Sequence, residues 1–199
     1  MKRSIVALPI SASMLGLVLS CGSPAPTVDP PAQTFDQPTS QPPTIKTGAP
    51  TNSRGAIEKE WLELAGAGCD VPSDCDVLFS IDAPQSATEC LAQLPPENGT
   101  LLAFPSILQT GTKFDPATYG AFLRAFDFKT IDASGYTVAG LSTDASINCA
   151  ESDTIPANLA KNSKYSGFVV LDVPANAVTL TYDPFGDGGW EWKLNGGII

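Results

Sequence analysis

The sequence contains no histidine, and its cations are few: 11 Lys and Arg residues face 21 Asp and Glu residues, which gives a net charge of −10. Without imidazole the chain can form no Ser-His-Asp or Cys-His catalytic group and no His-containing zinc site. The negative charge repels the phosphates of nucleic acids and the headgroups of anionic lipids. The composition therefore argues against nucleic-acid binding and against electrostatic attachment to a membrane surface.

Long apolar runs are also scarce, and the one that could be a targeting segment lies near the N-terminus. Two cations at the N-terminus are followed by a charge-free run from Ile5 to Leu19. This order of charge and apolar residues is typical of an export signal. A membrane-spanning helix needs about 20 apolar residues, and the run does not resume after residue 20. We therefore interpret residues 1–20 as a signal peptide.

The end of the apolar run, Val18-Leu19-Ser20-Cys21, resembles the lipobox of bacterial lipoproteins. The resemblance implies that Cys21 becomes the mature N-terminus and carries lipid, whose acyl chains, such as palmitate, hold the protein in the bacterial cell membrane with its domain facing outward. Several acyl chains anchor a protein far more firmly than one. The alternative is a plain secretory signal in which Cys21 is an ordinary thiol.

Lipid on Cys21 would leave an even set of cysteines, namely Cys69, Cys75, Cys90 and Cys149. An even set in an exported protein predicts disulfides, and four cysteines permit three pairings. We favour a local bridge between Cys69 and Cys75 together with a Cys90–Cys149 bridge that closes a loop of about sixty residues. A site with four thiolate ligands is the competing idea, but paired Cys-x2-Cys spacings are missing, so no metal is expected.

Residues 22–54 contain 8 of the 18 prolines, together with 6 Thr and 3 Ser, and their only aromatic residue is Phe35. Such a composition cannot bury a core. A disordered Pro/Thr-rich tether is therefore predicted from Cys21 to Arg54. If it were wholly polyproline-like, it would reach on the order of 100 Å, at about 3.1 Å per residue.

Residues 55–199 carry 19 acidic and 7 basic side chains, a net charge of −12, and are numerous enough to form one core. Their apolar residues recur mostly at every second position, which predicts strands. Pro105 interrupts one of these segments and suggests an edge strand or a bulge. The clearest hairpin joins the last two segments through residues 183–189. The predicted strands are 77–81, 99–110, 131–141, 167–173, 178–182 and 190–194.

One segment has a helical pattern instead. Asp115-Pro116 is a typical helix start, and apolar residues follow with helical spacing from Tyr119 to Phe126. A single turn is also conceivable at 156–161. The sequence therefore predicts an all-β fold, an antiparallel β-sandwich with one short helix.

Three segments carry a resemblance to a known family: KYSGFVVLDVP at 164–174, VTLTYDP at 178–184 and GWEW at 189–192. They are similar to the closing strands of exported immunoglobulin-like domains in actinobacterial lipoproteins and in a secreted mycobacterial immunoprotective antigen. PENGTLLA at 96–103 is similar to a strand entry of that family, and Ile155-Pro156 to its approach to the D-V-P strand. The resemblance implies an immunoglobulin-like β-sandwich, a non-enzymatic extracellular module and no catalytic residues. We expect no cofactor.

Two acidic segments are candidate binding loops. Asp183 and Asp187 lie among three glycines, so a calcium loop is conceivable, but the EF-hand pattern is missing and a hairpin turn explains the same residues. Asp70, Asp74 and Asp76 form a second cluster beside the predicted Cys69–Cys75 disulfide, for which a solvated loop is the simpler interpretation. We keep Asp183 and Asp187 as possible ligand contacts.

Aromatic residues provide further candidates. Trp190 and Trp192 share one strand face and could form a platform for a sugar or a peptide, although such pairs more often belong to a core. Trp61 lies among charged residues and is the better candidate for an exposed ligand contact.

These observations favour a lipid-anchored, non-catalytic binding domain whose partner is an envelope protein or a wall polymer. One alternative is a structural or antigenic surface protein without a specific ligand. Another is a hydrolase that uses carboxylates without histidine, for which a cleft with convergent carboxylates would be required.

Overall fold

The computed structural model describes residues 50–71, 74–87, 94–149 and 154–194. The predicted signal peptide, Cys21, the tether as far as residue 49, and Cys90 lie outside these ranges.

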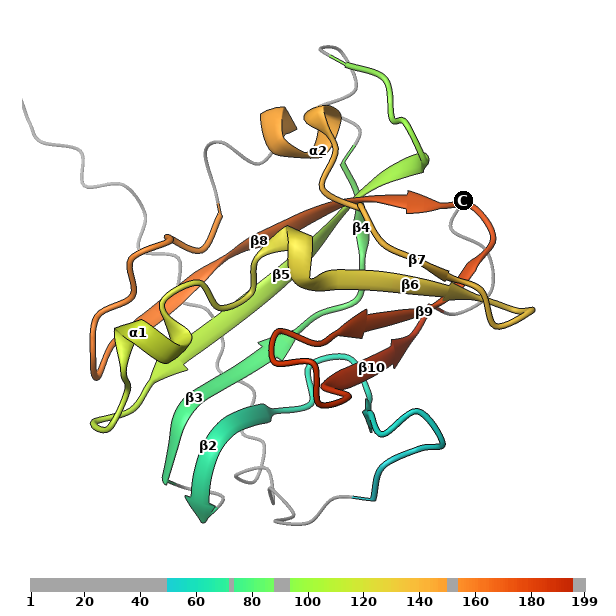
Figure 1. Ribbon diagram of the computed structural model, residues 1–199. Helices are drawn as coiled ribbons and strands as arrows, with labels where there is room; N and C mark the ends of the chain where they lie inside the picture. Colours follow the sequence, from blue (N-terminus) through green and yellow to red (C-terminus); the bar gives the residue numbers. More distant parts are fainter. Residues whose placement is uncertain (1–49, 72–73, 88–93, 150–153, 195–199) are drawn as a thin grey trace, which may run out of the picture. The chain divides into compact units, whose positions relative to one another are not determined.

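Two β-sheets pack face to face, which confirms the predicted all-β sandwich (Figure 1). One sheet has the order β1 (Ile57–Lys59), β10 (Trp190–Lys193), β9 (Ala177–Tyr182), β6 (Phe128–Asp132) and β7 (Thr137–Val138). In the other, β5 (Gly99–Thr110) pairs with β8 (Lys164–Pro174) on one side, and with β3 (Asp74–Ile81) and β4 (Gln85–Ser86) on the other. β2 (Ala65–Val71) pairs with β3 and is the edge strand. The short helices are α1 (Pro116–Tyr119), η2 (Ala125–Asp127) and α2 (Asp144–Cys149).

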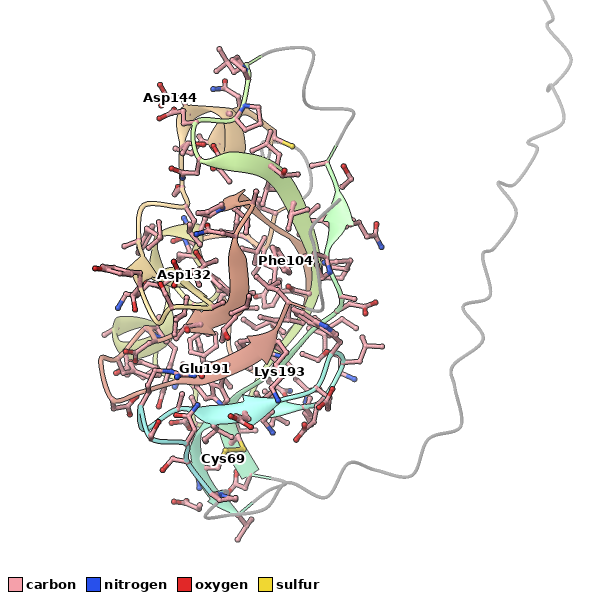
Figure 2. The ribbon with its side chains drawn as sticks, turned by 90° about the vertical axis from the view of Figure 1, so that its right-hand side faces the viewer. Cys69, Phe104, Asp132, Asp144, Glu191 and Lys193 are labelled. Carbon is pink, nitrogen blue, oxygen red and sulfur yellow. A yellow bond between two sulfur atoms is a disulfide. The ribbon has the colours of Figure 1, made fainter. Side chains whose placement is uncertain are left out.

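The core is formed by alternate residues of the strands, as the period of two predicts. Figure 2 shows Phe104 among the side chains between the two sheets. Trp190 and Trp192 are both buried there, which confirms the interpretation of this pair as core residues. The other large residues of the core include Phe79, Ile81, Leu102, Leu108, Val169, Leu171, Val173, Leu180 and Tyr182.

Strand pairing departs from the prediction in two places. β1 runs parallel to β10, so the first sheet is not wholly antiparallel. The predicted strand 131–141 is two strands, β6 and β7, because the Asp132 carboxylate accepts the N–H groups of Ser134 and Tyr136 (2.9 Å each) and turns the chain. The predicted hairpin between β9 and β10 is confirmed.

Pro105 lies within a central strand, so the prediction of an edge or a bulge is wrong. Its carbonyl accepts the N–H of Asp82 (2.8 Å) on the side of β5 that faces β3 and β4. The nitrogen of a strand residue points to the same side as its carbonyl. β3 ends at Ile81 and β4 begins at Gln85, so the missing N–H of Pro105 faces the interval between these two strands.

The helical segment begins as predicted but ends early. The Asp115 carboxylate accepts the N–H of Ala117 (3.1 Å) and caps α1. The helix stops at Tyr119, and Leu123 adopts φ 57° before η2 begins. The single turn considered at 156–161 forms no helix. No helix within the described ranges is long and apolar enough to cross a membrane.

α2 was not predicted, because its six residues give too short a stretch for a helical pattern. Its Ala145 packs against Leu101 on the face of β5 that points away from the core. Cys149 at its end is disulfide-bonded, and its partner lies outside the described residues. The Cys90–Cys149 pairing therefore stays a prediction.

The turn after α1 is held by a buried tyrosine. The N–H of Leu123 donates to the hydroxyl of Tyr182 (2.6 Å), and burial raises the pKa of Tyr182 far above its usual value, so the hydroxyl stays protonated. We expect Tyr182→Phe to lower the free energy of unfolding by about 1–3 kcal/mol, because it leaves a buried N–H without an acceptor. Urea unfolding measures this loss. Tyr165→Phe is the matched control, since the Tyr165 hydroxyl accepts the N–H of Ala160 at an exposed position; equal losses in both variants would contradict the account.

The folded part starts before the predicted boundary at Gly55. Asn52 Nδ2 donates to Glu191 of β10 (2.7 Å), and Arg54 Nε donates to the same carboxylate (2.8 Å). Burial alone would raise the pKa of Glu191, but hydrogen bonds from Arg54 and Asn52 hold it below its usual value. The composition of the tether could not show this earlier start, because Asn52 and Arg54 bind a residue nearly 140 positions away in the sequence.

Asp172, the acid of the D-V-P segment, has a structural role. Its carboxylate is fully buried and accepts three successive backbone N–H groups, from Glu97 (2.6 Å), Asn98 (3.1 Å) and Gly99 (3.0 Å). The hydroxyl of Thr143 donates to it as well (3.1 Å). Asp172 thereby joins the P-E-N-G turn to β8 and to the segment that precedes α2.

Candidate binding cleft

A cleft of about 450 Å³ lies between the edge strand β2 and the loop that joins β9 to β10. This volume lies within the range of small-molecule and cofactor sites. We call it the β2 cleft and define it by its lining residues. They are Gly66, Ala67 and Gly68 of β2; Thr118 and Tyr119 of α1; Phe185, Asp187, Gly189 and Trp190; and Thr51, Gly55 and Ile57.

One wall of the β2 cleft is a strand edge. The Ile81 carbonyl accepts the N–H of Leu62, on the side of β3 where β2 lies. Alternate residues of a strand point their N–H and C=O groups to the same edge, so the other odd-numbered residues of β3 also face β2. Val77 and Phe79 therefore bond to Ala67 and Ala65, with which they are in register. Gly66, between these two alanines, must point its N–H and C=O away from β3, toward the free edge.

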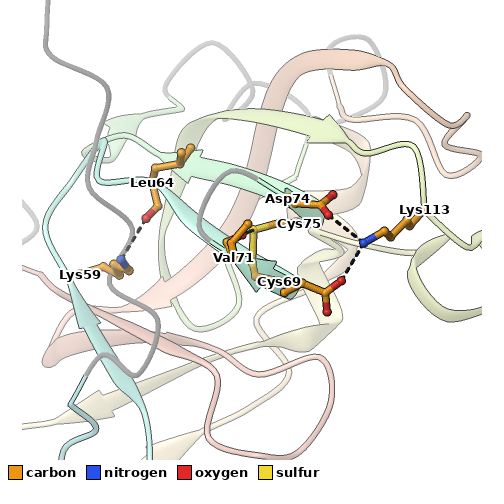
Figure 3. Close-up of a disulfide and its surroundings, with 8 residues drawn as sticks. Lys59, Leu64, Cys69, Val71, Asp74, Cys75 and Lys113 are labelled. Atoms are coloured by element: carbon orange, nitrogen blue, oxygen red, sulfur yellow. Dashed lines mark hydrogen bonds and ion pairs between the residues drawn. A yellow bond between two sulfur atoms is a disulfide. The ribbon is translucent and has the colours of Figure 1, made fainter.

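Both ends of this edge are closed (Figure 3). On one side Lys59 Nζ donates to the carbonyl of Leu64 (3.0 Å), which also points away from β3. On the other side the Cys69–Cys75 disulfide joins β2 to β3, which confirms this predicted bridge, and the register shifts between Cys69 and Val71. The open part of the edge is therefore short and consists of Gly66 to Gly68.

The opposite wall is aromatic. Phe185 is 43% exposed and meets the ring of Tyr119 edge-on, with ring centroids 5.8 Å apart. Tyr119 in turn stacks on the buried Phe114 (6.0 Å). Trp190 lines the cleft from β10 while its ring belongs to the core. The wall therefore offers ring surface that the core holds in place.

The charge of the β2 cleft is negative. Asp187 is exposed at its rim, and no Lys or Arg is among its lining residues. The hydroxyl of Tyr119 is hydrogen-bonded to Asp76; burial, followed by the charge of Asp76, raises the pKa of this phenol. Outside the cleft, Lys113 Nζ binds Asp70 (2.7 Å) and Asp74 (2.8 Å). The cleft therefore favours a neutral or cationic ligand.

The structure separates the predicted site residues. Asp187 lies in the cleft, whereas the Asp183 carboxylate accepts the N–H groups of Gly186 (2.8 Å) and Asp187 (3.1 Å) and shapes the turn. Asp70 and Asp74 converge on Lys113, whereas Asp76 is bound to Tyr119. Within the described residues, no group of three or more His, Cys, Asp or Glu side chains could hold a metal ion.

Trp61 is less exposed than predicted. Its ring stacks on Trp192 (6.3 Å between centroids) and packs against Phe104 (6.1 Å), so one face is covered by the core. The charged neighbours in sequence gave the wrong expectation: Glu58, Glu60 and Glu63 are exposed, but their exposure does not extend to the Trp61 ring. Trp61 does not line the β2 cleft.

Sequence reasoning missed Tyr119, Phe185 and the glycines of β2 as site residues. Gly66 and Gly68 carried a usable signal, since glycines within a strand often mark a bulge or a place where a ligand or another backbone approaches closely. A Cβ on Gly66 would lie 2.8 Å from Sγ of Cys69, and Gly68 has φ 62°. Both positions therefore require glycine.

Comparison with models of protein families, with curated proteins and with solved structures finds no match to this chain. The resemblance to exported immunoglobulin-like domains therefore stays a prediction.

Proposed function

We propose that the protein is an exported lipoprotein, held in the bacterial cell membrane by lipid on Cys21, which presents a non-catalytic binding domain outside the membrane. The β2 cleft takes the ligand, which belongs to the cell envelope. The observation that carries this proposal is the cleft itself, where exposed aromatic surface, an exposed carboxylate and an open strand edge meet. Aromatic surface with a few placed polar groups is typical of binding sites.

The alternatives differ in what the cleft would do. A structural or antigenic surface protein would need no ligand in it. A hydrolase would need two carboxylates facing a substrate at a defined separation. Asp187 has no second carboxylate beside it among the lining residues, and Asp76 is bound to Tyr119, so this arrangement favours binding over catalysis.

The membrane anchor has a direct test. We expect Cys21→Ala to move the protein from the membrane fraction to the soluble fraction, because the variant lacks the residue that would carry lipid. Mass spectrometry of the mature N-terminus measures the modification, and Ser23→Ala is the neighbouring control. A wild-type protein without added lipid mass would show instead a plain secretory signal.

The ligand site is tested by capture from cross-linked envelopes of the source cell. The full chain with Cys21→Ala is immobilised, and the double variant Phe185→Ala/Asp187→Asn is compared with Asp144→Asn. Asp144 is an exposed acid of α2, and Figure 2 shows it at the opposite end of the domain from Cys69. We expect the cleft variant to lose at least about tenfold of one captured component, which corresponds to about 1.4 kcal/mol, while the control retains it. Equal capture by all three proteins would overturn the assignment of the site.

A further inference from the structure

We propose that the ligand of the β2 cleft is an extended basic segment of a polypeptide, which pairs as a strand with the free edge of β2. This inference rests on the proposed function, since it names the class of ligand for the same cleft.

The strand edge is the first reason. Gly66 directs its N–H and C=O away from β3, and neither group has a hydrogen-bond partner within the described ranges. Edge strands with unpaired backbone groups bind extended peptides by adding them to the sheet. The glycines leave no side chain in the way, so a second backbone can approach. A sugar polymer without backbone amides could not form this ladder.

The limits of the edge fit one short segment. At one end of the edge, Lys59 already donates a hydrogen bond to the carbonyl of Leu64. At the other end, the Cys69–Cys75 disulfide and the irregular register prevent regular strand pairing. These closures prevent a long sheet-to-sheet contact with a second copy of the chain. They leave room for a peptide that pairs at Gly66 and continues across the cleft.

The negative charge of the cleft indicates that the peptide carries cationic side chains. The cleft contains Asp187 and no Lys or Arg, and residues 55–199 carry a net charge of −12. A cation on the peptide gains attraction to Asp187 and from the ring faces of Tyr119 and Phe185. Side chains on one face of a strand repeat about every 7 Å, so a cation and an apolar neighbour can each contact one part of the cleft.

The test uses fluorescence anisotropy with the full chain carrying Cys21→Ala and a labelled nine-residue peptide of alternating Lys and Val. A peptide of alternating Glu and Val tests charge. Two N-methylated versions of the Lys peptide test strand pairing. Alternate amides of an extended peptide point to opposite edges, so one version is methylated on the amides of one edge and the second on those of the other edge. A chitosan oligomer tests an amine on a glycan. Phe185→Ala and Asp187→Asn remove cleft contacts, Asp144→Asn is the charge-matched control, and unfolding curves confirm that the variants fold.

We expect the Lys peptide to bind and the Glu peptide not to bind. Blocking one of its edges should weaken binding at least about tenfold, Phe185→Ala about tenfold, and Asp187→Asn about two- to fivefold, with no change for Asp144→Asn. Equal binding of both charges, or full binding by both N-methylated copies, would overturn the inference. Binding of chitosan alone that depends on Phe185 would overturn the peptide and leave the proposed function intact. If no peptide binds and the cleft variant captures as much from envelopes as the wild type, both the peptide inference and the proposed function of the cleft would be overturned.

Discussion

Asp172→Ala is expected to cost about 3–5 kcal/mol in the free energy of unfolding. The carboxylate is fully buried and is the shared acceptor of three backbone N–H groups, from Glu97, Asn98 and Gly99, and of the Thr143 hydroxyl. A hydrogen bond to a charged group contributes about 1.5–3 kcal/mol, and water reaching the exposed turn at residues 97–99 would recover part of the sum. This loss is a large share of a typical domain stability of about 5–15 kcal/mol.

Urea unfolding with a fixed slope measures the loss, and hydrogen exchange at residues 97–99 shows where it occurs. Asp172→Asn is the graded control, because its single amide oxygen keeps part of the acceptor capacity and should lose about half as much. A loss below about 1 kcal/mol for Asp172→Ala, with unchanged exchange at 97–99, would contradict the structural role of this residue.

Arg54→Ala is expected to lower the free energy of unfolding by about 1–3 kcal/mol at neutral pH. Glu191 is only 3% exposed, and without Arg54 its carboxylate keeps, among the described residues, the hydrogen bonds from Asn52 and Thr181. Removing one partner of a buried ion pair costs more than an exposed pair contributes, and the half-exposed Arg54 reduces the effect.

The pH dependence of this loss has a defined sign. In the wild type the pKa of Glu191 is lowered by folding, so its stabilisation is present above the unfolded pKa of about 4.3 and disappears as the pH falls through the folded value. In Arg54→Ala burial dominates and raises the pKa, so protonation favours the folded state. The difference between the two proteins should therefore shrink from pH 7 to pH 4.

A double-mutant cycle isolates the pair. In the Glu191→Gln background there is no buried charge for Arg54 to neutralise, so Arg54→Ala should cost much less there than in the wild type. An equal cost in both backgrounds, or a cost independent of pH, would show that Arg54 acts without Glu191.

The strands were predictable wherever side chains alternate between core and solvent. The alternation of 77–81 and 178–182 predicts β3 and β9 because one face of each strand is buried. The parallel pairing of β1 with β10 was not predictable, since three residues carry no pattern and the Arg54 contact with Glu191 fixes the segment from a distance. Trp61 shows the same limit, because its burial depends on Trp192.

The cleft was predictable only in part. Asp187 follows from the turn composition, which marks an exposed loop. Tyr119 and Phe185 come together because α1 and the hairpin loop meet at one end of the sandwich, and their sequence separation hides this contact. Gly66 becomes part of the site only once the register of β2 and β3 decides which edge it faces.

Site-specific photo-cross-linking in the intact source cell tests most directly whether the β2 cleft holds a ligand. The photoreactive residue p-benzoylphenylalanine replaces Phe185 in one strain and Tyr136 in another. Tyr136 is 76% exposed, lies in the turn between β6 and β7, and does not line the cleft. Our account predicts a discrete light-dependent adduct at position 185, a weaker adduct on adding Asp187→Asn, and no such adduct at position 136. The same adducts at both positions, or none at 185, would contradict it.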